Sequence, residues 1–150
     1  MIYNKENFLQ FEHVLSELIN NKDSRRGLMV YIRPSIWHEY NKDNMNDFIC
    51  TLGVQYMIRN NELISVVNMR SNDMIYGFFN DYFWQATVHE RMYNALRSNG
   101  FEDLKFGKLI WVANSLHVYE KHFKMIQDMY EHLKNEMFDK PINDYYKQEK

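Results

Sequence analysis

A chain of 150 residues is long enough for one domain with a buried core, and its 45% apolar and 25% charged residues are ordinary for a globular protein. The net charge of −2 gives no general attraction to nucleic acid, and no apolar stretch approaches the roughly 18 residues that span a bilayer. The single cysteine, Cys50, excludes a disulfide within the chain, and the first residues lack a signal-peptide pattern, so we expect a cytoplasmic protein with neither nucleic acid nor a membrane as a partner.

The first third of the chain begins with a helix pattern. Residues 7–20 place apolar side chains on one face at helical spacing. These side chains are Phe8, Phe11, Val14, Leu15 and Leu18. Residues 28–34 predict a buried strand that Pro34 ends, and the polar residues 35–47 predict a loop.

A hairpin is expected in the middle of the chain. Residues 48–59 predict one or two strands, interrupted near Gly53. Asn60 and Asn61 can adopt the left-handed conformations of a tight turn, so residues 62–70 return as the partner strand.

The last third predicts two helices around a strand. Residues 81–98 form a helix, residues 108–119 a strand that runs into a loop, and residues 120–138 a second helix. The inward positions of the first helix are Phe83, Val88, Met92 and Leu96. Residues 139–150 are a tail, so the whole chain, 1–150, is expected to be a single α+β domain.

Cys50 is the first candidate for chemistry, and two interpretations remain open. It lies in an apolar segment, where a lone cysteine often acts as a small buried apolar residue. It is a nucleophile only if positive charge nearby favours the thiolate, and Arg70, across the hairpin, could supply that charge. Arg70 could instead form a surface ion pair with Asp73.

Two further motifs are ambiguous when taken singly. Arg25 and Arg26 stand side by side in a turn, where they either grip a phosphate or face solvent. His117 and Tyr119 project to the same side of an extended segment. His117 and His122 could bind a metal ion, but no second cluster of ligands supports them, so we expect no metal site.

The order of these motifs resembles the thymidylate synthase family, including its deoxycytidylate hydroxymethylase branch. The segments that carry the resemblance are "VLSELINNKDSRRGLMV", "CTLGVQYMIRNNELISVVNMRSND" and "ANSLHVYEKHF". Together they extend over about residues 8–125. The resemblance implies a thymidylate synthase-like α+β fold, with a mostly antiparallel or mixed sheet that is flanked by helices and used for dimerisation.

The resemblance also implies the reaction. The Cys50 thiolate would add to C6 of a pyrimidine nucleoside monophosphate, and C5 would then attack a one-carbon unit from 5,10-methylenetetrahydrofolate. Asp73 matches the position that faces this folate. Either hydroxymethylation or methylation would follow, and neither the product nor the choice between deoxyribose and ribose is decided by the residues.

Further residues would bind the nucleotide, by the same resemblance. Arg70 and Ser71 would bind its phosphate from one subunit, and Arg25 and Arg26 from the partner subunit of a homodimer. Gln55 would orient the nucleotide, and two residues would hold the sugar hydroxyl. These two are His117 and Tyr119.

The base-reading position lies four residues after a glycine in the family, and counting from Gly77 places Asp81 there. A protonated carboxyl group suits cytosine, whose N4 amine donates and whose N3 accepts, whereas the amide of Asn80 would suit uracil. We favour Asp81 and hence dCMP over dUMP. An alternative is that this pair only caps the following helix.

The sequence also departs from the family pattern. Ile49 and Thr51 flank the cysteine where proline and histidine are usual, and Asn114 and Ser115 replace glycine and aspartate. The N-terminal third of the family, which carries a catalytic glutamate, a phosphate-binding arginine and much of the folate pocket, has no counterpart here. We therefore consider three alternatives, which are a fragment, a partner for a separate N-terminal chain, and a reduced homologue that binds nucleotide without turnover.

Overall fold

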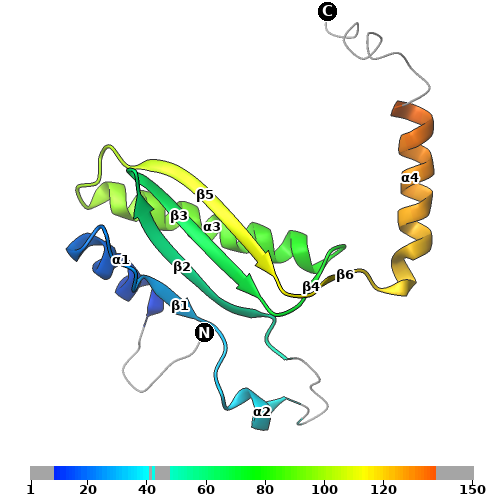
Figure 1. Cartoon of the computed structure of the whole chain (residues 1–150), viewed down its shortest axis with the longest axis horizontal. Helices are drawn as coiled ribbons and strands as arrows, with labels where there is room; N and C mark the ends of the chain where they lie inside the picture. Colours follow the sequence, from blue (N-terminus) through cyan, green and yellow to red (C-terminus); the bar gives the residue numbers. More distant parts are fainter. Residues whose placement is uncertain (1–8, 41, 43–47, 138–150) are drawn as a thin grey trace, which may run out of the picture. The chain divides into compact units, whose positions relative to one another are not determined.

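The computed structural model describes residues 9–40, 42 and 48–137, and its contacts divide the chain into two compact units between His117 and Val118. The first unit holds a four-stranded sheet of order β1-β2-β3-β5 (Figure 1). The strands are β1 (Leu28–Val30), β2 (Thr51–Arg59), β3 (Glu62–Met69) and β5 (Lys105–Ala113). β1, β2 and β3 pair antiparallel and β5 pairs parallel with β3, which confirms the expected mixed sheet of an α+β fold. The expected single domain stays a prediction.

Two helices supply the core with the apolar side chains that cover one face of the sheet. They are α1 (Gln10–Asn20) and α3 (Gly77–Ser98). Val14 and Leu18 of α1 are buried against the sheet, as their helical spacing predicts. Phe8 lies outside the described residues.

The β2–β3 hairpin turns where the sequence predicts it. Asn60 and Asn61 have φ angles of 51° and 62°, the left-handed conformation that asparagine tolerates better than most residues. The interruption expected at Gly53 is a bulge within one continuous strand, because Gly53 pairs with Asn68 but Thr51 pairs with Met69. A Cβ atom at Gly53 would lie 2.7 Å from the Met29 carbonyl oxygen, so the close approach of β1 requires glycine.

The expected buried strand over residues 28–34 and the loop over 35–47 were partly wrong. β1 ends at Val30, and of its three residues only Met29 is buried, because β1 is the edge strand and its other side chains lie on the open face. Within the expected loop, Ile36–Glu39 form the short helix α2, which buries Ile36. Residues 41 and 43–47 lie outside the described part of the chain.

Helix α3 begins four residues earlier than expected, and one of its four predicted inward positions was wrong. Val88, Met92 and Leu96 are buried as predicted, but Phe83 is 74% exposed. At 3.6 residues per turn, Phe83 is about 140° around the helix from Val88, and Gln85 occupies the buried stripe instead.

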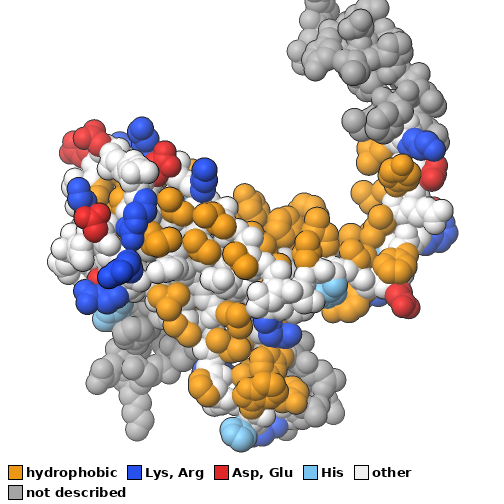
Figure 2. All heavy atoms as spheres, viewed as in Figure 1, with side chains coloured by type: hydrophobic (Ala, Val, Ile, Leu, Met, Phe, Trp, Pro, Cys, Tyr) orange, Lys and Arg blue, Asp and Glu red, His pale blue; other side chains and the backbone are white. Residues whose placement is uncertain are grey.

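The opposite face of the sheet carries apolar side chains that the described residues of this unit leave wholly or partly exposed. Figure 2 shows these hydrophobic side chains gathered over the strands. They are Leu28, Val30, Met57, Ile64, Val66, Ile110 and Val112. An apolar sheet face of this kind is typical of a protein-binding surface.

The last third of the chain contains the strand and the second helix that the sequence predicts. The strand predicted over 108–119 consists of β5 and β6 (Leu116–His117), and β6 pairs parallel with β4 (Asn72–Asp73). The second unit contains a 3₁₀ turn, Glu120–His122, and α4, Phe123–Met137. The end of the helix predicted to reach residue 138 and the tail 139–150 lie outside the described residues. No described helix is both long enough and apolar enough to cross a membrane.

His89 generates a prediction about stability, because its imidazole is 1% exposed between Tyr56 and Phe106. Burial lowers the pKa of His89, so below about pH 6.5 the unfolded chain takes up a proton that the folded chain does not bind. The free energy of unfolding should therefore decrease as the pH falls from about 6.5 toward the lowered pKa. Urea unfolding at several pH values measures this decrease, which should be smaller in His89→Gln.

A matched control is His38→Gln, because His38 is an exposed residue of α2. This variant should keep the pH dependence of the unaltered chain. An unchanged pH dependence in His89→Gln would show that His89 is not the responsible group.

Candidate active site

Cys50 and Arg70 are brought side by side by the register of the hairpin. Because the bulge places two residues of β2 opposite one of β3, Arg70 lies beside Cys50, and its backbone N–H donates to the Cys50 carbonyl at 2.8 Å. Without this bulge Arg70 would lie opposite Thr51. The Cys50 side chain is exposed, so the hypothesis of a small buried apolar residue was wrong.

The Arg70 guanidinium holds the segment that ends at Cys50. It donates from Nε to the Ile49 carbonyl at 2.9 Å and from Nη2 to the Phe48 carbonyl at 2.6 Å. Nη2 also lies 3.7 Å from Cys50 Sγ, and the guanidinium carbon lies 4.9 Å from the centre of the Phe48 ring. This arrangement places a permanent positive charge beside the exposed thiol.

The residues after Arg70 bring Asp73 and His117 together. β4 and β6 place Asp73 opposite His117, and the Met74 N–H donates to the His117 carbonyl at 2.9 Å. The Asp73 carboxylate accepts hydrogen bonds from the N–H groups of Ile75 and Tyr76 at 3.1 and 3.3 Å. Asp73 therefore has a structural use in the turn before α3 as well as any role in binding.

Asp81 lies partly buried one turn after Gly77, the first residue of α3, whereas Asn80 is exposed. The Asn72 amide donates from Nδ2 to Asp81 Oδ2 at 3.1 Å. Burial raises the pKa of the Asp81 carboxyl, and this hydrogen bond opposes the rise. Neither Asp81 nor Asn80 is the N-cap of the helix, which is Tyr76, so the interpretation of the pair as a cap was wrong.

Sequence reasoning missed two residues behind Asp81. Asn72 is 2% exposed, and its Oδ1 accepts a hydrogen bond from Trp111 Nε1 at 3.1 Å. Asn72 stands inside the "RSND" segment, but nothing in its spacing reveals its partners, because Trp111 follows 39 residues later in β5.

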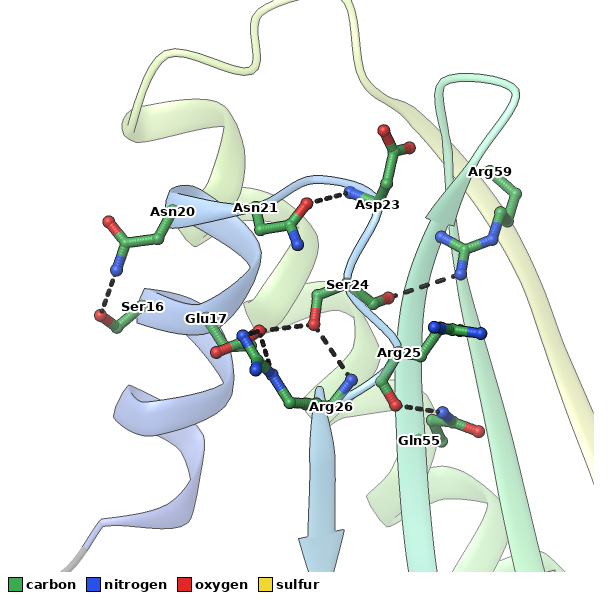
Figure 3. A network of polar contacts seen from close by, with 10 residues as sticks. All are labelled: Ser16, Glu17, Asn20, Asn21, Asp23, Ser24, Arg25, Arg26, Gln55 and Arg59. Carbon is green, nitrogen blue, oxygen red and sulfur yellow. Dashed lines mark hydrogen bonds and ion pairs between the residues drawn. The ribbon is translucent and has the colours of Figure 1, made fainter.

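The paired arginines lie in a turn that is fixed by buried polar contacts (Figure 3). Ser24, which is 3% exposed, donates from Oγ to Glu17 at 2.6 Å and accepts the Arg26 N–H at 3.0 Å. The Arg26 guanidinium also contacts Glu17, with Nη2 2.9 Å from Oε1. Hydrogen bonds from Ser24 and Arg26 lower the pKa of the Glu17 carboxyl, so Glu17 is an ionised partner at neutral pH.

The side chains of Arg25 and Arg26 are both exposed, and the Arg25 carbonyl accepts a hydrogen bond from Gln55 Nε2 at 2.9 Å. Arg59, which sequence reasoning also missed, donates from Nη2 to the Ser24 carbonyl at 3.4 Å. Figure 3 shows the Arg59 guanidinium beside this turn. These contacts gather basic side chains at the end of β2 that lies away from Cys50.

Within one chain, the structure does not bring the turn with Arg25 and Arg26 close to the pair formed by Cys50 and Arg70. The turn that carries Arg25 and Arg26 is held beside Tyr56, whose N–H donates to the Gly27 carbonyl at 2.7 Å. Tyr56 is six residues along β2 from Cys50, which corresponds to roughly 20 Å of strand. Tyr119 belongs to the second unit, where its ring lies 5.4 Å from Lys121 Nζ.

Comparison with known proteins gives one family and several relatives. The family model for thymidylate synthase matches residues 2–148. A deoxycytidylate 5-hydroxymethyltransferase of Enterobacteria phage T4 is 47% identical over 126 residues, which cover 83% of this chain and 51% of that protein. A putative thymidylate synthase of Methanocaldococcus jannaschii is 27% identical over 117 residues, which cover 78% and 50%. The chain thus spans about half the length of these curated relatives.

A solved structure supports the fold. Thermostable thymidylate synthase A from Bacillus subtilis superposes with a TM-score of 0.67 at 24% identity, covering 87% of this chain and 43% of that chain. At this identity the likeness shows the fold alone.

The contacts of Arg70 predict that it orders the backbone before β2. Arg70→Ala removes both donors to the Phe48 and Ile49 carbonyls, so deuterium uptake in a peptide covering residues 48–54 should become several-fold faster. The control is Arg97→Ala, whose guanidinium lies over the Tyr93 ring on α3 and should leave this peptide unchanged. Equal uptake in Arg70→Ala and the unaltered chain would contradict the prediction.

Ser24 predicts a measurable stability effect at the arginine turn. Ser24→Ala removes a buried hydroxyl that donates to Glu17 and accepts from the Arg26 N–H, so the free energy of unfolding should decrease by about 1–2 kcal/mol in urea denaturation. Ser16→Ala, at an exposed position of the same helix as Glu17, should change it by less than about 0.5 kcal/mol. A similar effect of the two changes would argue against the network.

Proposed function

Because the chain belongs to the thymidylate synthase family, we propose that it acts in one-carbon transfer to C5 of a pyrimidine nucleoside monophosphate, with dCMP preferred over dUMP. The observation that carries the proposal is the pair formed by the exposed Cys50 thiol and the Arg70 guanidinium. The 47% identity with the phage T4 deoxycytidylate 5-hydroxymethyltransferase supports cytosine as the base.

Cys50 is the proposed nucleophile. Its sulfur bonds to C6 of the pyrimidine while the C5–C6 π bond breaks, and the electron pair makes C5 a carbon nucleophile. The one-carbon unit would bond to C5, C5 would lose its proton to solvent, and water would replace the folate nitrogen on that unit to leave a hydroxymethyl group. Cleavage of the S–C6 bond would then restore the double bond and the Cys50 thiolate. Arg70 assists by keeping positive charge beside the sulfur.

The phosphate requires more cationic donors than one chain places near Cys50. Arg70 and Ser71 would bind it from the same chain, while Arg25 and Arg26 would come from a second copy. The apolar open face of the sheet supports a homodimer, because pairing this face with that of a second copy would bury it. Both arginine side chains are exposed, and Arg26 also lies close to Glu17.

Asp81 is the proposed base-reading residue. A neutral carboxyl group can donate to N3 of cytosine and accept from its N4 amine, and the raised pKa of Asp81 favours this neutral form. Asn80 is the less suitable candidate, because it is exposed. Gln55 and His117 would orient the nucleotide and its sugar, and the role of Tyr119 stays a prediction from the sequence.

5,10-methylenetetrahydrofolate would supply the one-carbon unit, and Asp73 is the residue proposed to hold it. The Asp73 carboxylate accepts backbone N–H groups at both oxygens, and a carboxylate acceptor is the group that a ring N–H of a folate would require. Hydroxymethyl transfer is favoured over methyl transfer by the same relative that supports cytosine.

Release of tritium from C5-labelled dCMP and dUMP tests the proposal, with and without methylenetetrahydrofolate. We expect folate-dependent release that is faster from dCMP and absent in Cys50→Ala. Asp81→Asn should shift the preference toward dUMP by about tenfold or more, because an amide matches uracil. Asp103→Asn, at an exposed position of the loop before β5, should leave the preference unchanged.

Two other outcomes have clear meanings. Release from dUMP alone would assign the base-reading role to Asn80. Tight nucleotide binding without any release would favour the alternative of a nucleotide-binding homologue, or of a chain that needs the half of its relatives that it does not match. Binding of neither nucleotide would refute the proposed function.

A further inference from the structure

We propose that Asn72, oriented by Trp111, is a positioning residue that makes Asp81 selective for cytosine by deciding which of its two carboxyl oxygens carries the proton. This inference deepens the proposed function and rests on it. It addresses a weakness of a neutral carboxyl group as a base reader. In a neutral carboxyl group one oxygen donates and the other accepts. With the proton on one oxygen the group would match cytosine, and with the proton on the other oxygen it would match uracil.

The orientation of the Asn72 amide follows from its neighbour. An indole N–H can only donate, so the Asn72 atom that lies 3.1 Å from Trp111 Nε1 is the carbonyl oxygen Oδ1. The amide nitrogen therefore points the other way and donates to Asp81 Oδ2 at 3.1 Å. Without Trp111 either end of the amide could face Asp81, because the two ends have nearly the same shape.

The position of Asn72 leaves little freedom for this amide. Asn72 is 2% exposed, and its backbone N–H donates to the Ser115 carbonyl at 2.9 Å within the β4–β6 pair. Trp111 is fixed in β5 and its ring packs against Phe78 and Tyr82 of α3, with ring centres 5.6 and 6.1 Å away. The backbone of Asn72 is thus held by β4 and β6, and the Trp111 ring is held by β5 and α3.

The backbone of Gly77 lies close to the Asn72–Asp81 hydrogen bond, with no side chain between them. A Cβ atom at Gly77 would lie 3.7 Å from Asn72 Nδ2 and 3.9 Å from Asp81 Oδ2, so any side chain there would begin in contact with both. The first residue of α3 therefore lies directly against the Asn72–Asp81 hydrogen bond.

The consequence for Asp81 is a fixed order of donor and acceptor. An amide N–H at Oδ2 favours that oxygen as an acceptor, so the proton of the neutral carboxyl resides on Oδ1. Oδ1 then donates to N3 of cytosine, and Oδ2 accepts from the N4 amine through its second lone pair. Uracil would need the proton on Oδ2, opposite its O4, and the Asn72 amide disfavours that form. Burial, which raises the pKa of Asp81, supports the neutral state on which this order depends.

Trp111→Phe tests the inference, since it removes the N–H that orients Asn72 and retains an aromatic ring. The dissociation constants of dCMP and dUMP, measured by calorimetry, should change unequally, so that the preference for dCMP falls by about tenfold. Asn72→Ala should have a similar effect. Trp84→Phe, at a 57% exposed position of α3, is the matched control and should keep the preference. A purely structural role would weaken the binding of both nucleotides by the same factor, and that result would overturn the inference.

A double-variant comparison and a measurement without nucleotide complete the test. In the Asp81→Asn background, Trp111→Phe should no longer change the ratio of the two dissociation constants, because no carboxyl proton remains to be placed.

In the nucleotide-free chain, Asp81→Asn should shift the NMR signal of the Asn72 side-chain amide, and an unmoved signal would show that the hydrogen bond is absent. If the unaltered chain binds neither nucleotide, the proposed function fails and the inference fails with it. If it prefers dCMP and Trp111→Phe keeps that preference, the inference alone fails.

Discussion

The register of the β2–β3 hairpin is the constraint on which the rest of the site depends. Asn60 and Asn61 set the turn, and the bulge near Gly53 then shifts the pairing by one residue, so that Arg70 lies beside Cys50. A slip of one residue would exchange the two faces of the strand and separate the guanidinium from the thiol. The Met29 carbonyl of β1 leaves no room for a side chain at Gly53, so the position next to this bulge requires glycine.

The two faces of the sheet have different uses. One face, covered by α1 and α3, buries the core that fixes the strands, while the other presents apolar side chains and, near the end of β2, the arginine turn. The Glu17–Ser24–Arg26 network holds this turn by contacts within one chain. In the proposed homodimer, a turn that is held in this way would need little ordering on association.

The start of α3 places residues that stabilise the turn next to the proposed base-reading residue. Asp73 supports the turn that leads into the helix, Gly77 begins it, and Asp81 follows one turn later beside Asn72. Backbone hydrogen bonds at β4 and β6 hold this region to the end of the sheet. The carboxyl group that would read the base is therefore positioned by buried partners, and its orientation does not depend on the solvent-exposed side chains of the same turn.

The sequence by itself determined the long helices, the β2–β3 hairpin and the order of the motifs. Helical spacing predicted α1 and the buried stripe of α3 from Val88 onward, and Asn60–Asn61 predicted the hairpin, because local periodicity and turn chemistry depend on neighbouring residues alone. The motif order indicated the family, which the match over residues 2–148 bears out. Only the tertiary structure decided that Phe83 is exposed, that Cys50 is not buried, and that β1 lies at an edge.

The partners of the site residues likewise came from the tertiary structure. Asn72 meets Trp111 across 39 residues, and Arg59 meets the Ser24 carbonyl across 35. No spacing rule links such pairs, because each contact exists only after the strands have paired and the helix has packed on them. The sequence thus named Cys50, Arg70 and Asp81 as candidates. The β2–β3 hairpin showed what places Arg70 beside Cys50, and the packing of β4, β5 and α3 showed what holds Asp81.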